Sequence, residues 1–361
     1  MTVGMADPRI GVPELDSLVE TAIGGRIADG PEVRAFESAF AAHCDVDHGV
    51  ATSNGTTALH AALKGLGIGP GDRVVTTPFS FVATANAVRL CGADPVFADV
   101  DSSTLNLDPE AVRDVVADHN GDVDAIIAVH LYGLPAAMDE LQAIAEEYDA
   151  ALVEDAAQAH GATLDGRPAG SLGDTACFSF YPTKNMTTGE GGMVLTDDGD
   201  LAQRVARFVN HGRTGSYEHS EVGHNFRLTS LGAGLGRAQL DRLPEFVDIR
   251  RRNAAKYDGA LAEQPAVTAP PDPSNARHAY HQYTVRTEHR EALRDHLADA
   301  GIDTGVYYPT PIHRQPAYAD IGGSAPVAER AAETVLSVPV HPSLDRSEVD
   351  AVADALEGFS P

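Results

Sequence analysis

The chain has 361 residues, a length that favours one large domain with a smaller one, or two domains of similar size. It contains 26 Lys and Arg and 53 Asp and Glu, which gives a net charge of −27. This charge argues against a surface that binds nucleic-acid phosphates or an anionic membrane. Only three basic residues are lysines, Lys64, Lys184 and Lys256. An acidic chain poor in lysine is typical of a halophilic protein, whose charge keeps it soluble in salt.

Cysteine is sparse, with Cys44, Cys91 and Cys177 and no C-x-x-C pair. This pattern indicates neither a disulfide scaffold nor a thiolate zinc site, and the spacing of the histidines indicates no other metal site. The first fifteen residues lack a basic segment followed by an apolar run, and no apolar stretch approaches eighteen residues. We therefore expect a soluble, cytoplasmic protein without a bound metal.

From about residue 48, short β-branched runs alternate with Ala-rich stretches of helical pattern, which is typical of βα units and a mostly parallel sheet. The predicted strands are residues 49–52, 73–77, 95–100, 125–130, 151–154, 176–180 and 192–196. The predicted helices are residues 57–66, 81–91, 109–118, 137–148 and 201–209. The unbroken apolar run A-I-I-A-V at 125–129 favours a sheet that helices cover on both faces.

After Leu231 the composition changes. An Arg-rich segment at 239–261 predicts a long helix, and a Pro-rich segment at 265–273 follows it. The remainder, with a strand-like run at 280–286 and helical patterns at 290–300 and 347–357, is typical of a small α+β domain. We predict a large α/β domain over residues 1–240, and a linking helix with a small C-terminal domain over residues 241–361.

Two segments at predicted strand ends could bind ligands. The segment S-N-G-T-T at 53–57 precedes a helix, where backbone N–H groups and hydroxyls can hold a phosphate; alone, a Ser/Thr helix cap is the simpler interpretation. Asp155 follows a buried strand, at the sheet edge where α/β proteins bind ligands, so it requires a cation nearby. The alternatives for Asp155 are a solvated loop carboxylate and a helix cap.

Lys184 lies at the centre of a long turn, rich in Ser, Thr and Gly, between two predicted strands. In a chain that uses arginine almost everywhere, a lysine indicates a place where only an amine serves, such as covalent attachment to an aldehyde. Lys64 and Lys256 fit surface roles better. A surface ion pair is the alternative for Lys184.

Together these segments resemble the DegT/DnrJ/EryC1/StrS family of pyridoxal-phosphate-dependent sugar aminotransferases, a branch of the fold type I enzymes. The resemblance covers nearly the whole chain and rests on the order and spacing of its segments. These are G-P-E-V at 30–33 with F-E at 36–37, S-N-G-T-T-A-L at 53–59, T-P-F-S-F-V-A-T-A-N-A-V at 77–88, V-H-L-Y-G at 129–133, E-D-A-A-Q-A-H-G at 154–161, F-S-F-Y-P-T-K-N-M-T-T-G-E-G-G at 178–192, N-H-G-R at 210–213, H-N-F-R-L-T at 224–229 and Y-Y-P-T-P-I-H at 307–313. It implies a large domain with a mostly parallel seven-stranded sheet flanked by helices, and a small C-terminal α+β domain.

The resemblance also implies roles for the cofactor residues. Lys184 would bind pyridoxal phosphate covalently and move the proton during transamination. Asp155 would pair with the protonated pyridine nitrogen, and Gln158 would hydrogen-bond the ring hydroxyl. Phe81 would stack on the ring; the alternative is that it is a core aromatic residue on an apolar helix. The residues that would hold the phosphate are Gly55, Thr56 and Ser179.

Three further residues match the family, one at the cofactor of a neighbouring subunit and two on the substrate side. Asn225 matches a residue that reaches the neighbouring subunit's cofactor phosphate, which implies a homodimer with shared active sites; a plain turn residue is the alternative. Tyr308 and His313 resemble residues on the sugar side of the site, and a structural histidine is the alternative for His313.

The implied activity is transfer of an amino group, from L-glutamate, to a nucleotide-linked keto sugar in amino-sugar and polysaccharide biosynthesis. The loop at 224–229 favours a 4-keto-6-deoxy sugar, with a 3-keto sugar or a keto-inositol as alternatives. A regulatory or sensor protein on the same fold is a further alternative, against which the retained Lys184, Asp155 and Gln158 argue. The sequence departs from the family at Gly232 and Gly234, where we expect added glycine to loosen the nearby loop.

Overall fold

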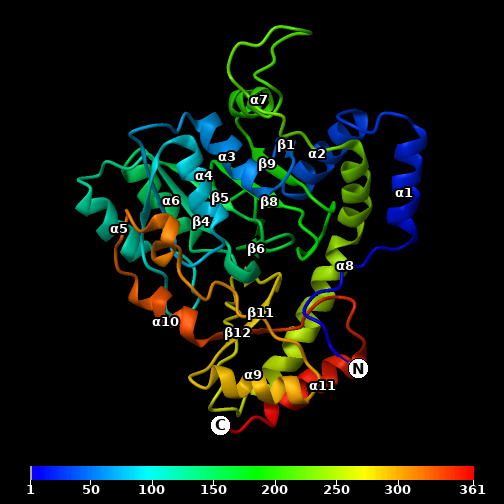
Figure 1. The fold of residues 1–361 in the computed structure, drawn as a ribbon, viewed down its shortest axis with the longest axis vertical. Helices are drawn as coiled ribbons and strands as arrows, with labels where there is room; N and C mark the ends of the chain where they lie inside the picture. The colour runs from blue at the N-terminus through cyan, green and yellow to red at the C-terminus, as the bar shows by residue number, and fades with distance from the viewer. Residues whose placement is uncertain (1) are drawn as a thin grey trace.

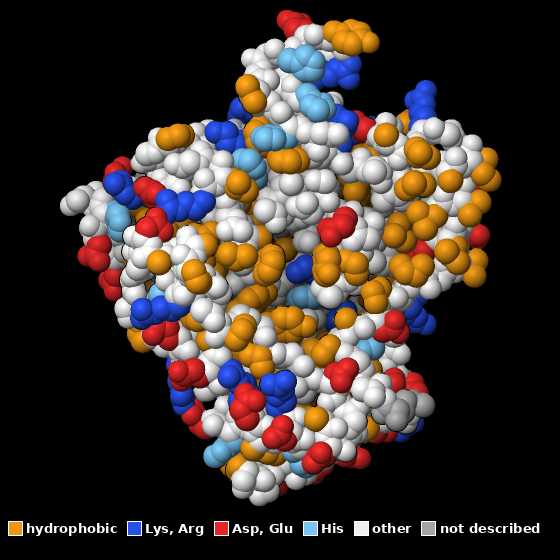
Figure 2. Space-filling model, viewed as in Figure 1, with side chains coloured by type: hydrophobic (Ala, Val, Ile, Leu, Met, Phe, Trp, Pro, Cys, Tyr) orange, Lys and Arg blue, Asp and Glu red, His pale blue; other side chains and the backbone are white. Residues whose placement is uncertain are grey.

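The computed structural model describes residues 2–361. A larger part contains the central sheet, and a smaller part lies below it in Figure 1, with the long helix α8 (Ser230–Leu261) running through both. The face shown in Figure 2 is hollowed between the two parts, with hydrophobic side chains around the hollow. Within the described residues, no helix is both long and apolar enough to cross a membrane.

All seven predicted strands are present and form one sheet, in the order β1-β9-β8-β5-β4-β2-β3. They are β1 (His48–Thr52), β2 (Arg73–Thr76), β3 (Asp94–Phe97), β4 (Ala125–Val129), β5 (Ala151–Asp155), β8 (Thr175–Ser179) and β9 (Gly192–Thr196). The five strands from β8 to β3 are parallel, and β9 is antiparallel to both of its neighbours. Because parallel strands end at one sheet edge, Asp155 and Ser179, the last residues of β5 and β8, lie at the same edge.

Helices cover both faces of this sheet, as predicted. The five helices expected between strands are α3 (Gly55–Leu66), α4 (Ala83–Cys91), α5 (Pro109–Asp118), α6 (Met138–Glu147) and α7 (Gly199–Phe208). Helices α3, α4 and α7 share an apolar cluster with one set of alternate strand residues, including Val74 and Val153. Helices α5 and α6 pack against the opposite set, including Val75 and Leu152. Because successive side chains of a strand point to opposite faces, the sheet has a separate apolar layer on each face.

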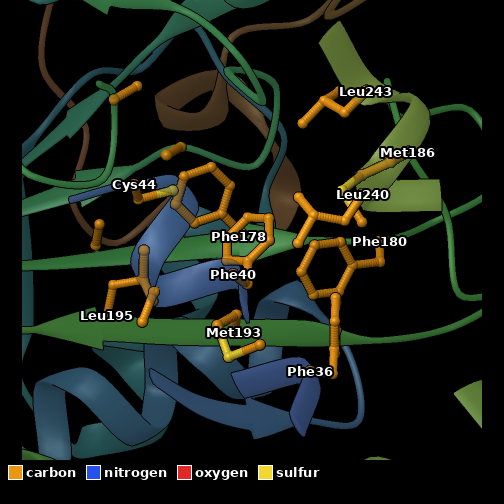
Figure 3. Close-up of a cluster of buried hydrophobic side chains, with 14 of the residues drawn as sticks. Phe36, Phe40, Cys44, Phe178, Phe180, Met186, Met193, Leu195, Leu240 and Leu243 are labelled. Atoms are coloured by element: carbon orange, nitrogen blue, oxygen red, sulfur yellow. The ribbon is translucent and has the colours of Figure 1, made fainter. Parts of the chain in front are cut away.

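A third cluster joins the sheet to α2 (Pro31–His43) and α8, and Figure 3 shows its aromatic centre. The Phe40 ring lies 4.9 Å from that of Phe178 and 5.2 Å from that of Phe180, in edge-to-face arrangements. Since side chains alternate along a strand, burying Phe178 and Phe180 directs Ser179 to the opposite face. The core therefore anchors the chain just before the turn that carries Lys184.

Helix α8 begins at Ser230, nine residues before the predicted start at Gln239. The Thr229 side chain accepts a hydrogen bond from the Gly232 N–H and caps the helix. The glycines here also permit close packing, because a Cβ on Gly234 would lie 2.7 Å from Thr21 Oγ1 of α1 (Val12–Ile23). The expectation that Gly232 and Gly234 loosen a loop is therefore wrong: both lie inside the helix.

The smaller part has its own apolar cluster. In it β11 (Tyr283–Arg286) pairs antiparallel with β12 (Val335–Val338), and α9 (Arg290–Asp299) and α11 (Arg346–Glu357) pack nearby. The remaining elements are α10 (Pro326–Thr334), three short 3₁₀ segments (Leu131–Gly133, Ile312–Arg314 and Pro316–Tyr318) and a small sheet of β6 (Thr163–Leu164), β7 (Arg167–Pro168) and β10 (Ala276–Arg277). Since α8 continues unbroken across residue 240, the domain boundary placed there stays a prediction.

Candidate active site

A pocket of about 800 Å³ lies at the carboxyl edge of the sheet, between the two parts of the chain. Eight of the residues predicted for the site line it: Gly55, Thr56, Phe81, Asp155, Gln158, Ser179, Lys184 and Tyr308. These residues come from five separate stretches of sequence. The pocket is lined mainly by apolar surface with a few converging polar groups, which is typical of a small-molecule site.

Asp155 ends strand β5 and is only 6% exposed, so the solvated-loop interpretation is wrong. Its Oδ2 accepts a hydrogen bond from Thr84 Oγ1 at 2.8 Å, and its Oδ1 accepts one from the Ala157 N–H at 3.3 Å. Burial raises the pKa of this carboxyl group, although these hydrogen bonds and the charge of Lys184 oppose the shift. A carboxylate held in this way is best stabilised by a cation in the pocket.

A second carboxylate, on the opposite face of the sheet, stabilises the end of β5. Glu154 is fully buried and lies 2.8 Å from His130 Nε2. It also accepts hydrogen bonds from three backbone N–H groups, those of Gly170, Leu172 and Gly173. A buried carboxylate with this many donors is well satisfied, and it fixes the end of β5 from which Asp155 points into the pocket.

Lys184 is half-buried in the pocket wall and forms no ion pair with a described residue, so the surface ion pair is wrong. Its turn is held by Asn185, whose Nδ2 donates to the carbonyl of Ala279 at 3.0 Å. Burial lowers the pKa of Lys184 to about 8, against the opposing charge of Asp155. Much of this amine is therefore neutral, and nucleophilic, at mildly alkaline pH.

The other lysines lie outside the pocket. Lys64 donates from Nζ to the carbonyl of Ile68 at 3.2 Å near the end of α3. Lys256 pairs with Asp350 at 3.2 Å on the surface. The sequence-based choice of Lys184 over these two is thus supported by position.

The N-terminus of α3 is capped by Asn54, where the sequence favoured a Ser or Thr cap, and the anion site at this terminus stays a prediction. The Asn54 side chain caps the helix by accepting from the Thr57 N–H at 2.9 Å. Gly55 and Thr56, the first two helical residues, face the pocket together with Ser179. A Cβ on Gly55 would lie 2.7 Å from Ser179 Cβ, so only glycine permits this approach. Amides at a helix N-terminus, beside hydroxyls, favour a phosphate.

Phe81 and Gln158 occupy different positions in the pocket. The Phe81 side chain is 62% exposed, so its interpretation as a core aromatic is wrong. Gln158 is buried and links two tyrosines: its Oε1 accepts from the Tyr132 N–H at 2.8 Å, and its Nε2 donates to the Tyr308 hydroxyl at 2.9 Å. The second hydrogen of that amide remains available for a ligand.

His313 and Asn225 do not line this pocket. His313 is buried, with Nε2 at 2.9 Å from Glu329 Oε1, and faces a separate cavity beside Phe97. This contact favours the structural alternative for His313. Asn225 is exposed and pairs with Asn210 in an isolated bridge at the base of the loop that follows α7. It is not among the residues that line the pocket, and its predicted role in a partner's site stays a prediction.

Several pocket residues were missed by the sequence analysis. They are Ser80, Thr84, Tyr132, Tyr181, Glu190, His281, Gln282 and Tyr307. Thr84 and Tyr132 lie inside segments that carry the family resemblance, but their residue types alone do not distinguish a pocket position from a core position. The contact between Thr84 and Asp155 joins residues 71 positions apart and could be found only from the fold.

The chain matches the model of the DegT/DnrJ/EryC1/StrS aminotransferase family over residues 8–357. It belongs to this family. It is 40% identical over 367 residues to the dTDP-3-amino-3,4,6-trideoxy-alpha-D-glucose transaminase of Streptomyces venezuelae, with 99% of this chain and 96% of the relative covered. It is 39% identical over 333 residues to the UDP-2-acetamido-2-deoxy-3-oxo-D-glucuronate aminotransferase of Pseudomonas aeruginosa, with 92% of both chains covered. The crystal structure of S. venezuelae DesV in complex with a ketimine intermediate has a TM-score of 0.92 at 40% identity, covering 95% of this chain and 93% of that one.

Aminotransferases of this family depend on pyridoxal 5′-phosphate. The pocket residues fit this cofactor. Lys184 offers an amine of lowered pKa for the aldehyde, and Asp155 is a buried carboxylate that requires a cationic partner such as the ring nitrogen. The N-terminus of α3 provides amides for the phosphate, and Phe81 offers an exposed aromatic ring. The sugar aminotransferase fold and cofactor predicted from the sequence are confirmed.

Proposed function

We propose that this aminotransferase moves an amino group from an amino-acid donor, L-glutamate, to a nucleotide-linked keto sugar. The observation that carries the proposal is the convergence of Lys184 and Asp155 in one pocket of about 800 Å³. Pockets of this size accommodate drug-sized ligands. Both retained groups also argue against a sensor on the same fold, since ligand sensing alone requires neither a reactive amine nor a buried carboxylate.

The bound cofactor supplies an electron sink that stabilises negative charge on the substrate carbon. Asp155 holds the proton on the ring nitrogen, which keeps that sink cationic. Lys184 Nζ removes the α-proton of the donor and later returns a proton to the sugar carbon. A pKa of about 8 suits both directions of this transfer near neutral pH.

The position of the ketone has two candidates. The names of the S. venezuelae and P. aeruginosa relatives both specify position 3, which favours a 3-keto sugar. The loop H-N-F-R-L-T at 224–229 favours a 4-keto-6-deoxy sugar. Both candidates share the cofactor residues, so turnover of matched 3-keto and 4-keto nucleotide sugars decides between them.

The proposal is tested first by the visible absorbance of the purified protein before and after L-glutamate, followed by borohydride reduction and peptide mapping. We expect a yellow protein that bleaches with L-glutamate and carries the reduced cofactor on Lys184. The bleached protein should then regain its colour with a nucleotide-linked keto sugar. If the colour does not respond to L-glutamate, this donor is contradicted. If none of the nucleotide-linked keto sugars restores the colour, the substrate class is contradicted.

We also propose a homodimer with shared active sites. Asn225 is exposed at the base of the loop that follows α7, where it has access to a second chain. Helix α1 exposes apolar side chains at spacings of three and four, and Figure 2 shows the patch over this helix. Its members are Val12, Leu15, Val19 and Ile23. An exposed apolar stripe of this kind is typical of a protein–protein contact.

Asn225→Asp should weaken cofactor binding at least about tenfold, because a carboxylate near the partner's cofactor phosphate is repelled by it. The dissociation constant of pyridoxal phosphate, measured by absorbance titration, checks this. Gln203→Glu adds the same charge on the exposed face of α7 and should leave the constant unchanged. Equal affinities for the Asn225 variant and the native chain would count against a shared site.

A further inference from the structure

Two tyrosines in the pocket wall share an unusual backbone conformation. Tyr132 has φ of 56° and Tyr308 has φ of 61°, both in the left-handed region that non-glycine residues rarely adopt. Their rings are stacked, with centroids 6.2 Å apart and planes inclined by 15°. One comes from the segment after β4 and the other from the smaller part of the chain. Strained residues of this kind persist where the surroundings hold them and are concentrated at ligand sites.

Gln158 holds the two tyrosines together. It accepts from the Tyr132 backbone N–H and donates to the Tyr308 hydroxyl, at 2.8 and 2.9 Å. The Tyr308 hydroxyl thus accepts from a protein partner. The same bonds tie the Tyr132 backbone and the Tyr308 ring to a residue predicted to contact the cofactor, so the position of the tyrosine pair is coupled to the cofactor side of the pocket.

The Tyr132 hydroxyl differs, because it has no hydrogen-bond partner among the described residues. Its side chain is only 6% exposed, and the ring packs in an apolar cluster with Phe79 and Leu131. A phenylalanine would fill this space without leaving a buried polar group unpaired. Packing alone therefore does not require a tyrosine at this position, and because Tyr132 lines the pocket, a ligand there would supply the missing acceptor.

The chemistry of the hydroxyl defines what it can bind. Burial and the neighbouring hydroxyls of Tyr307 and Tyr308 raise the pKa of Tyr132 well above its ordinary value, so the group stays protonated. A protonated hydroxyl fixed in an apolar wall serves as a donor to a ligand oxygen. The cofactor has other partners in the pocket, at Lys184, Asp155 and the N-terminus of α3. Of the ligands proposed here, the sugar is the one that brings several oxygen acceptors on one ring.

We propose that Tyr132 is a specificity-determining residue: its hydroxyl donates a hydrogen bond to a ring-substituent oxygen of the keto sugar, and the Tyr132–Gln158–Tyr308 arrangement fixes its direction. This inference rests on the proposed function. A site that pairs with a substrate hydroxyl or carbonyl discriminates against analogues that lack it, because the protein donor then stays unpaired.

The test compares Tyr132→Phe with the native holoenzyme. We expect an unchanged or higher melting temperature, since the variant removes an unpaired buried hydroxyl. The bleaching rate with L-glutamate should be unchanged. The KM for the keto sugar should rise about fivefold to tenfold, the effect of losing one neutral hydrogen bond, with kcat nearly constant because binding in the ground state is lost.

Tyr280→Phe is the matched control. Tyr280 also has a positive φ, of 45°, and a buried hydroxyl without a described partner, but it does not line the pocket. Its variant should leave the KM for the sugar unchanged. An unchanged KM in Tyr132→Phe would overturn the inference, as would a slower reaction with L-glutamate, which would place the hydroxyl on the donor or cofactor side.

Failure of the proposed function is visible separately. The native enzyme would then turn over no nucleotide-linked keto sugar, which would overturn both proposals. Failure of the inference alone leaves native turnover intact and shows only in the comparison of the two variants with the native chain.

Discussion

Replacement of Lys184 by alanine should reduce transamination by a factor of about 10⁴ or more, because Lys184 is the one lysine in the pocket and is the group proposed to move the proton. The fold should persist. Burial lowers the pKa of Lys184, so the folded protein holds that proton less tightly than the unfolded chain. At pH 7 the charged amine therefore costs stability, and the cofactor-free variant should melt at the same temperature or higher.

Single-turnover bleaching with L-glutamate and thermal melting of the cofactor-free protein measure the two effects. Lys256→Ala removes a lysine from the surface pair with Asp350 and should retain native activity. Transamination by the Lys184 variant at a rate within tenfold of native would refute the assignment. Loss of the melting transition would instead give Lys184 a structural role.

Asp155→Asn should slow the reaction on the order of 10²-fold or more while leaving cofactor bound. The amide keeps the shape of the carboxyl group: its oxygen can still accept from the Ala157 N–H, and its NH2 group can donate to the Thr84 hydroxyl oxygen. It carries no negative charge, however, and so does not hold a proton on the ring nitrogen. The loss should therefore appear in the chemical step and much less in the amount of bound cofactor.

Stability gives an independent check on Asp155. Burial raises the pKa of this carboxyl group, so its ionised form costs folding free energy as pH rises through the range between the unfolded and the folded pKa. At pH 7 the cofactor-free asparagine variant should be at least as stable as the native chain. Asp345→Asn, at the cap of α11, is the control for activity and should react at the native rate. A native rate in the Asp155 variant would exclude a role at the ring nitrogen.

The sheet was largely predictable from the sequence, since each strand is a short apolar run between turn residues. The apolar run at 125–129 became the interior strand β4, buried throughout. Helix starts were harder to predict. Helix α8 contains Gly232, Gly234, Gly236 and Pro244, residues that disfavour helices locally, and yet it is helical from Ser230. Close packing against α1 and α2 favours those glycines and overrides the local propensity.

The candidate site was predictable in part. Lys184 and Asp155 stood out because a rare lysine and a strand-end carboxylate are unusual in themselves. Tyr132 had no such signal, because a tyrosine between leucine and glycine has the same local appearance in a core or in a pocket. The role of His313 was equally undecided by residue type, and its contact with Glu329 favours structure.

The sequence by itself determined the seven strands, the helices between them and the family, and it singled out Lys184 as the candidate reactive amine, since these follow from periodicity, residue type and the order of segments along the chain. Only the tertiary structure decided which of those residues meet. Residues 55, 84, 155, 184 and 308 converge because strands β5 and β8 end at one edge, α3 begins there, and the smaller part closes over it. Such contacts depend on which apolar faces pack together between segments far apart in the sequence, and the local sequence pattern does not predict them.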